Sequence, residues 1–147
     1  MNPHDVPARP PFSVRARLLT PLAAGGTFHE LDGLAQVDAA GRLTYVGPAT
    51  DRPADSGGAI DLRPWVLMPG MVDTHAHLPQ LPNAGVGFAL DLLTWLDRLT
   101  FPTERSWADT AVAERLAPPI FRAFAAAGTT TVLAYGVVYE AAMDAAF

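Results

Sequence analysis

The apolar run at residues 66–72 ends in the sequence DTHAH at residues 73–77, and this junction constrains the fold more than any other stretch. An apolar run that ends in polar residues is typical of a buried strand. Because side chains alternate along a strand, His75 and His77 are expected on one face and Ala76 on the other. Two imidazoles at a strand end can bind one divalent cation, although an exposed pair without a ligand has the same spacing.

The segments before this run predict a β-rich first part. Residues 1–11 are rich in proline and predict a disordered arm. Residues 12–65 predict a small β domain, in which alternation over residues 12–20 indicates a half-buried strand and residues 34–47 indicate a hairpin. We expect this domain to be sandwich-like.

The segments after this run change to a helical period. Apolar residues recur between Phe88 and Leu99 on one helical face. Ser106 followed by Asp109 has the pattern of a capping box and predicts the start of the next helix. Gly128 is well placed to end that helix.

A strand and a further helix follow in the predicted order. Residues 129–136 are β-branched and apolar and predict a buried strand, whereas residues 137–147 begin another helix. The pair Pro118-Pro119 predicts a break in the preceding helix, because proline removes a backbone donor and clashes with the turn before it. This α/β order favours a parallel sheet built from βα units. The chain stops within a helical pattern, so we expect it to be the beginning of a longer fold.

The composition excludes several classes of function. The 147 residues have a formal net charge of −5, and the ten basic residues are all arginines scattered along the chain, which disfavours nucleic-acid binding. There is no cysteine for a disulfide or thiolate site, and no apolar stretch is long enough to span a membrane. We expect a soluble, cytoplasmic protein.

The stretch LMPGMVDTHAH at residues 67–77 resembles the first barrel strand of the amidohydrolase superfamily of metal-dependent hydrolases and deaminases. Its continuation is similar to the guanine deaminase branch: HLPQ at residues 77–80, LLTWLDRLTFPTE at residues 92–104 and AGTTTV at residues 127–132. The resemblance implies that residues 66–147 are the start of an incomplete (β/α)₈ barrel, with active-site residues at the carboxyl ends of its strands.

The resemblance also implies roles for individual residues. It makes His75 and His77 ligands of one divalent metal ion, normally zinc, and Gln80 a contact to the edge of a purine base. Gln suits that role because its amide offers both a donor and an acceptor. Asp73 is expected to support the pair by hydrogen bonding rather than to act as a catalyst. The segment at residues 92–104 is expected to cover the pocket.

The implied reaction is guanine plus water to xanthine plus ammonia, through a metal-activated water. The family's other metal ligands and its proton-transfer residues follow later in the sequence than this chain extends, so no catalytic residue is expected within it. The isolated chain is therefore expected to be inactive. Its expected partner is a small-molecule purine, and the longer parent protein is expected to be a homodimer.

Two alternatives remain open at this point. The first is another deaminase or hydrolase of the superfamily, acting on an oxidised purine, cytosine or a triazine. The second is a non-catalytic truncated fragment with a vestigial metal site. Gln80 and the sequence TFPTE at residues 100–104 favour guanine over the first alternative.

Overall fold

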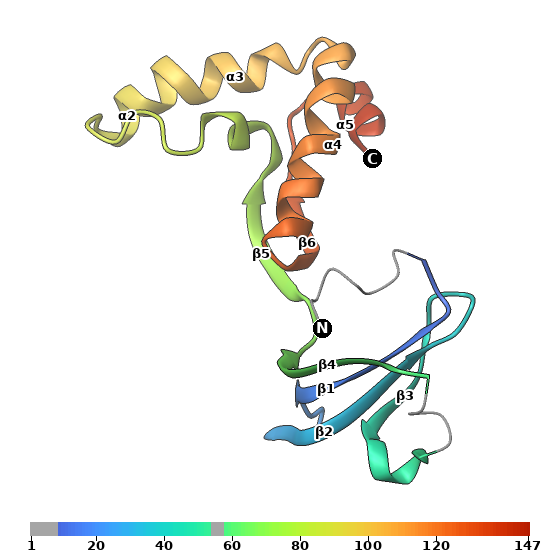
Figure 1. Cartoon of the computed structure of the whole chain (residues 1–147). Helices are drawn as coiled ribbons and strands as arrows, with labels where there is room; N and C mark the ends of the chain where they lie inside the picture. The colour runs from blue at the N-terminus through green and yellow to red at the C-terminus, as the bar shows by residue number, and fades with distance from the viewer. Residues whose placement is uncertain (1–8, 54–57) are drawn as a thin grey trace. The chain divides into compact units, whose positions relative to one another are not determined.

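The computed structural model describes residues 9–53 and 58–147. Most of the expected N-terminal arm, residues 1–8, therefore lies outside the described residues, as do residues 54–57 of the expected β domain. The chain divides into two compact units, Met1–Pro69 and Gly70–Phe147 (Figure 1). In the ranges described, no helix is long and apolar enough to cross a membrane.

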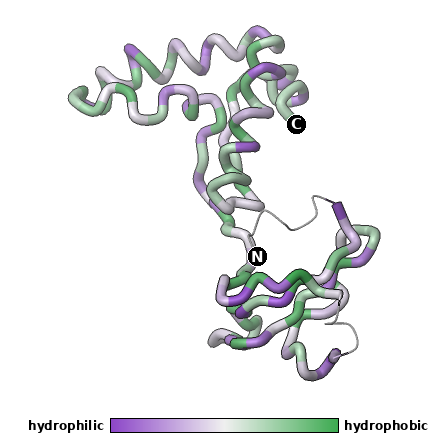
Figure 2. The backbone as a smooth tube through the Cα atoms, viewed as in Figure 1, coloured by the Kyte–Doolittle hydropathy of each residue, from purple (hydrophilic) through white to green (hydrophobic). Residues whose placement is uncertain are grey.

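The described residues of the first unit form one four-stranded sheet. Its strands are β1 (Phe12–Pro21), β2 (Thr27–Val37), β3 (Leu43–Pro48) and β4 (Ile60–Leu67). They lie in the order β3-β2-β1-β4, with β4 parallel to β1 and the other neighbours antiparallel. The expected sandwich is wrong, because in the described ranges these strands pair side by side in a single sheet. Apolar and polar residues alternate along β1 (Figure 2), which gives it a row of buried side chains: Val14, Ala16 and Leu18.

The predicted hairpin between β2 and β3 is confirmed. The Asp38 side chain accepts hydrogen bonds from the backbone N–H groups of Ala40 and Arg42, both at 2.9 Å. Gly41 has a φ of +78°, a conformation that glycine adopts without steric cost. The turn is followed by a 3₁₀ turn, η2 (Ala49–Asp51), after β3.

A network of two arginines and two aspartates joins three strands of this sheet. Arg15 of β1 donates from Nε and Nη2 to the two carboxylate oxygens of Asp32 on β2, at 2.6 and 2.5 Å. Arg63 of β4 donates to Asp32 at 3.1 Å and to both oxygens of Asp61, at 2.9 and 2.5 Å. Hydrogen bonds from these arginines hold the pKa of Asp32 and of Asp61 below the usual range.

The second unit contains the expected parallel pair of strands. β5 (Met71–His77) pairs in parallel with β6 (Thr129–Tyr135), which confirms the predicted βα order (Figure 1). The helices α4 (Thr110–Ala126) and α5 (Glu140–Ala146) pack against each other. One buried cluster joins these two helices to the residue directly after β5, and it is formed by Leu78, Trp107, Ala113, Ala117, Ile120 and Ala142. The described residues of this unit form one two-stranded parallel sheet and no closed barrel.

The predicted helix over residues 88–99 begins later than expected. Asp91 is its N-cap and accepts from the backbone N–H of Thr94 at 3.1 Å, so Phe88 lies outside the helix and is 92% exposed. The helical run continues through α2 (Leu92–Trp95), a π-helical turn η4 (Leu96–Thr100) and α3 (Phe101–Ser106).

The predicted cap at Ser106 is wrong. Ser106 is the last residue of α3, and its hydroxyl donates to the carbonyl of Thr103 at 2.6 Å. Asp109 caps α4 instead, because its side chain accepts from the backbone N–H of Ala111 at 3.0 Å. The two candidates are three positions apart, and Trp107 between them is fully buried.

The predicted break at Pro118-Pro119 is also wrong, since α4 runs without interruption from Thr110 to Ala126. Both prolines are exposed, and so are Glu114 and Arg115, whose carbonyls lose their helical partners. Water can satisfy those carbonyls, while the opposite face of the helix stays anchored in the core. Gly128, with a φ of +88°, follows the end of the helix as predicted.

Candidate active site

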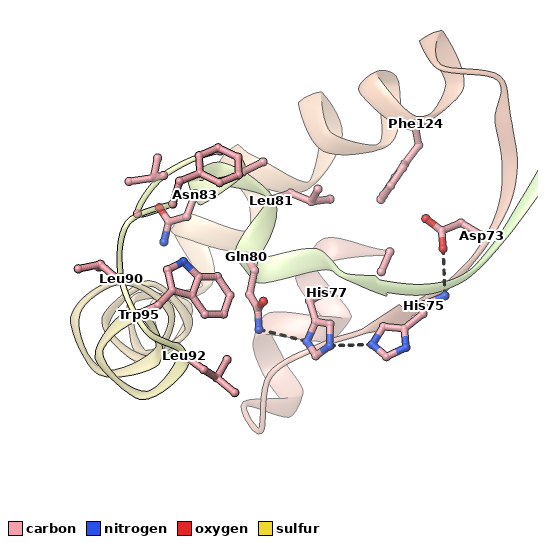
Figure 3. Close-up of a pocket in the computed structure, with 16 residues that line it drawn as sticks. Asp73, His75, His77, Gln80, Leu81, Asn83, Leu90, Leu92, Trp95 and Phe124 are labelled. Atoms are coloured by element: carbon pink, nitrogen blue, oxygen red, sulfur yellow. Dashed lines mark hydrogen bonds between the residues drawn. The ribbon is translucent and has the colours of Figure 1, made fainter.

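The histidine pair lies at the carboxyl end of β5. The rings of His75 and His77 lie on the same side of the strand with their centroids 5.3 Å apart, and their Nε2 atoms approach to 3.3 Å (Figure 3). The pairing of β5 with β6 shifts between Asp73 and Ala76, so three steps along β5 match two along β6. Such a bulge redirects side chains and is common beside active sites.

Asp73 stabilises this irregular stretch through the backbone. Its Oδ1 accepts a hydrogen bond from the backbone N–H of His75 at 3.0 Å (Figure 3). The sequence predicts a supporting hydrogen bond from Asp73. In the structure that bond fixes where the His75 backbone lies and is not made to an imidazole nitrogen. Asp73 therefore acts on the pair through the conformation of the strand.

Gln80 extends the polar row beyond His77. It lies on the 3₁₀ segment η3 (Leu78–Asn83), which follows β5 directly. Its Nε2 is 3.1 Å from Nδ1 of His77 and donates to Oε1 of Glu104 on α3 at 2.7 Å. The structure thus brings His75, His77 and Gln80 into one row that ends at Glu104.

Tyr135 is a neighbour of the histidine pair that was not predicted from the sequence. It is the last residue of β6 and pairs with His77 in the register of the two strands. Its ring lies 4.9 Å from each imidazole centroid and is nearly parallel to that of His77, at 15°. The βα order of the sequence could have indicated it, because that order predicts neighbouring parallel strands, whose carboxyl ends lie side by side.

A cleft of about 680 Å³ opens beside this row. Asp73, His75, His77 and Gln80 line it together with a larger set of mostly apolar residues: Leu81, Val86, Phe88, Leu90, Leu92, Trp95 and Phe124 (Figure 3). Of the segment at residues 92–104, Leu92 and Trp95 of α2 line the cleft, and its expected role as a cover stays a prediction. The cleft is therefore polar at the strand end and apolar elsewhere.

Asn83 and Thr103 tie the helical run α2–η4–α3 to η3. The Asn83 side-chain amide donates to the carbonyl of Leu99 at 3.2 Å and to the hydroxyl of Thr103. The Thr103 hydroxyl in turn donates to the same carbonyl at 2.7 Å. Asn83 and Glu104 were not predicted from the sequence as parts of the site. Their contacts join residues about 20 positions apart, which no local pattern reveals.

The geometry of the imidazole pair fits a shared divalent cation. Two nitrogens bound tetrahedrally to one zinc ion at about 2.0–2.1 Å lie about 3.3 Å apart, and the two Nε2 atoms are 3.3 Å apart. Without a cation, the two Nε2 atoms can share a hydrogen bond instead. Nδ1 of His77 faces the Gln80 amide as an acceptor, so the proton of this ring can lie on Nε2, between the two imidazoles. Among the described residues, no group of three or more His, Asp, Glu or Cys side chains could hold a metal ion.

The sequence of this chain is similar to that of known proteins. Residues 66–147 match the sequence model of the Amidohydrolase family. A probable guanine deaminase of Deinococcus radiodurans is 39% identical over 122 residues, which cover 79% of this chain and 28% of that protein. The guanine deaminase of Escherichia coli is 39% identical over 87 residues, covering 59% of this chain and 20% of that protein.

Solved structures give the same relationship. The E. coli guanine deaminase superposes with a TM-score of 0.77 at 27% identity, covering 94% of this chain and 33% of that chain. The guanine deaminase from Bradyrhizobium japonicum superposes with a TM-score of 0.73 at 25% identity, covering 92% and 32%. The chain thus spans at most about a third of the length of these relatives.

Proposed function

The chain belongs to the amidohydrolase family, and from this premise we propose that it forms one part of the active site of a metal-dependent guanine deaminase. The reaction would convert guanine and water to xanthine and ammonia. One observation carries the proposal: His75 and His77 converge at a strand end with Gln80 beside them, on the wall of a cleft. The names of the relatives support guanine as the substrate.

His75 and His77 would hold the cation, which we propose to be zinc, through their Nε2 atoms. When bound, such a cation supplies Lewis acidity and lowers the pKa of a bound water towards neutrality. Asp73 would keep the His75 backbone in place, through its hydrogen bond to the backbone N–H. Tyr135 would restrict both rings, because it stacks on His77 and packs at a tilt against His75.

Gln80 would orient the base at the polar end of the cleft. Its amide stands beside His77, so a ring atom that it holds would lie close to the imidazole pair. The apolar walls supplied by residues such as Trp95 and Phe124 suit a flat aromatic base and exclude water from it. This division of the cleft matches a ligand that is polar at its edges and apolar on its faces.

We further propose that this chain alone does not turn guanine over. Catalytic zinc sites use three protein ligands and keep one position open for water or substrate. The described residues supply the two imidazoles, and no larger cluster of metal-binding side chains occurs among them. The remaining ligands and the proton-transfer groups would then come from further barrel strands.

A substrate panel tests this proposal. The zinc-loaded product of the gene, read to its natural stop codon, is assayed for ammonia release from guanine, 8-oxoguanine, cytosine and a triazine. We expect the highest kcat/KM with guanine and no turnover by the 147-residue chain. Faster turnover of another ring would overturn the substrate, and turnover of guanine by the short chain would overturn its proposed incompleteness.

A further inference from the structure

The contact between Gln80 and Glu104 determines which way the Gln80 amide is turned. An ionised carboxylate can only accept hydrogen bonds, so the amide atom 2.7 Å from Glu104 Oε1 has to be the nitrogen. The opposite orientation would place two oxygens with no hydrogen between them at that distance. Glu104 therefore supplies a chemical reason for one of two orientations that are otherwise almost equal in shape.

The position of Glu104 is itself held by a second contact between the same two segments. Gln80 and Asn83 both lie on η3, and they reach Glu104 and Thr103, which are adjacent on α3. Two side-by-side polar pairs thus connect η3 to α3. The contact between Asn83 and Thr103 fixes the distance between these two segments. The Glu104 carboxylate therefore stays within hydrogen-bonding distance of Gln80, and it cannot easily move if the Gln80 amide turns over.

One hydrogen-bonding atom of Gln80 has no partner among the described residues. One N–H is used by Glu104, and the other points to Nδ1 of His77 at 3.1 Å. The carbonyl Oε1 accepts no hydrogen bond from the described residues. Gln80 lines the cleft, so its free oxygen is an acceptor that selects a ligand edge carrying an N–H donor.

We propose that Glu104 is a positioning residue that fixes the orientation of the Gln80 amide and thereby determines which base edge the cleft accepts. This rests on the proposed function, in which Gln80 contacts the base. A cation held by Nε2 of His77 would place the proton of that ring on Nδ1, where it opposes the Gln80 N–H, so the amide would have to move away from His77. Glu104 would still accept from the other N–H and prevent the amide from turning over, and the displaced N–H and Oε1 would together present a donor and an acceptor to the base.

The sequence makes a direct test simple, because it contains only two glutamines, Gln36 and Gln80, and two asparagines, Asn2 and Asn83. The nitrogen-15 spectrum of the chain therefore has four side-chain amide groups to assign. We compare wild type, Glu104→Gln and Thr103→Ala, measuring amide proton shifts and exchange with water. Glu104→Gln keeps the shape of the side chain but can both donate and accept, so it no longer imposes one orientation.

Each substitution is expected to affect one of the two side-chain amides and to leave the other unchanged. In Glu104→Gln, the Gln80 amide protons should shift and exchange about tenfold faster or more, because the hydrogen bond to an ionised group is lost. The Asn83 and Gln36 amides should stay unchanged. In Thr103→Ala, the Asn83 amide should shift and the Gln80 amide should keep its slow exchange. If Glu104→Gln does not fold, Glu104→Asp replaces it, since the shorter side chain cannot span 2.7 Å without movement and the same loss is expected.

An unchanged Gln80 amide in the Glu104 variant would overturn the proposal, and so would an equal response of Gln80 and Asn83 to either substitution. The measurement needs neither turnover nor guanine. A failure of the proposed substrate would leave the amide result intact, whereas a failure of the amide result would leave the activity of the longer protein intact. The two ideas can therefore fail separately.

Discussion

The two units of the chain use polar side chains in opposite ways. On the sheet of the first unit, Arg15, Arg63, Asp32 and Asp61 bind one another, and both oxygens of each carboxylate accept from an arginine. In the second unit, the row from the histidine pair to Glu104 leaves the Gln80 amide oxygen without a hydrogen-bond partner among the described residues. The first network is complete in itself, and the second has capacity left over for a ligand.

A polar network that leaves a hydrogen-bonding atom without a partner indicates the functional site better than the charge or the burial of its side chains does. The four charged groups of the sheet are partly exposed and form ion pairs with one another. This arrangement stabilises the sheet and leaves none of the four groups without a partner. The second unit directs two imidazoles at one point beside a cleft. Polar groups that converge beside a cleft and leave a hydrogen-bonding atom without a partner are typical of a binding site.

Loss of an imidazole should have the largest effect. In the product of the gene read to its natural stop codon, His77→Ala is expected to lower zinc affinity by more than the roughly 10- to 100-fold that loss of an outer hydrogen-bonding partner costs. Competition with a chelator measures the affinity. His29→Ala is the matched control, because His29 is an exposed histidine of β2. Equal losses in the two variants would contradict the assignment of the pair.

Truncation of the core of the first unit should affect stability alone. Leu34 is fully buried, so Leu34→Ala is expected to lower the free energy of unfolding by about 2–5 kcal/mol. Leu31→Ala on the same strand is the control, since Leu31 is 57% exposed and should cost far less. Urea unfolding measures both. A similar cost at the two positions would contradict the burial pattern of β2.

Asp73 should have an intermediate effect on the site. Asp73→Ala removes the acceptor for the His75 backbone N–H and is expected to lower zinc affinity by about tenfold. Asp73→Asn keeps an oxygen at that position and should retain most of the affinity. If both substitutions weaken zinc binding equally, the carboxylate charge matters and not the backbone hydrogen bond.

The pH dependence of stability should show the smallest effect. The pKa values of Asp32 and Asp61 are lowered by the arginines, so the unfolded chain takes up protons first as the pH falls. The network should contribute fully to the free energy of unfolding above the ordinary Asp pKa of about 3.9. This contribution should be lost as the pH falls towards the lower pKa values of the folded state. Thermal unfolding across this range measures it. Asp61→Asn should flatten the dependence, and an unchanged profile would contradict a stabilising role.

Local patterns in the sequence predict much of the architecture. The apolar run before His75, the β-branched strand after Gly128 and the turn at Gly41 each form as expected. These features depend on strand alternation and on backbone conformations that glycine favours, which are properties of short segments. The same reasoning places the two imidazoles on one face of a strand.

The failures arise where packing overrides local preference. The α4 helix passes through Pro118-Pro119 because the lost hydrogen bonds fall on its exposed face. Asp109 caps it in place of Ser106, with Trp107 buried just before it. Glu104 could not be predicted at all, because its contact with Gln80 depends on how η3 and α3 meet in space.

The most direct test of the central claim is one assay on the longer gene product, with zinc content and ammonia release from guanine measured on the same preparation. We expect about one zinc ion per chain and turnover of guanine in the wild type, with both lost in His75→Ala/His77→Ala. A doubly substituted protein that keeps its zinc and its activity would contradict the claim that this pair is part of the catalytic metal site.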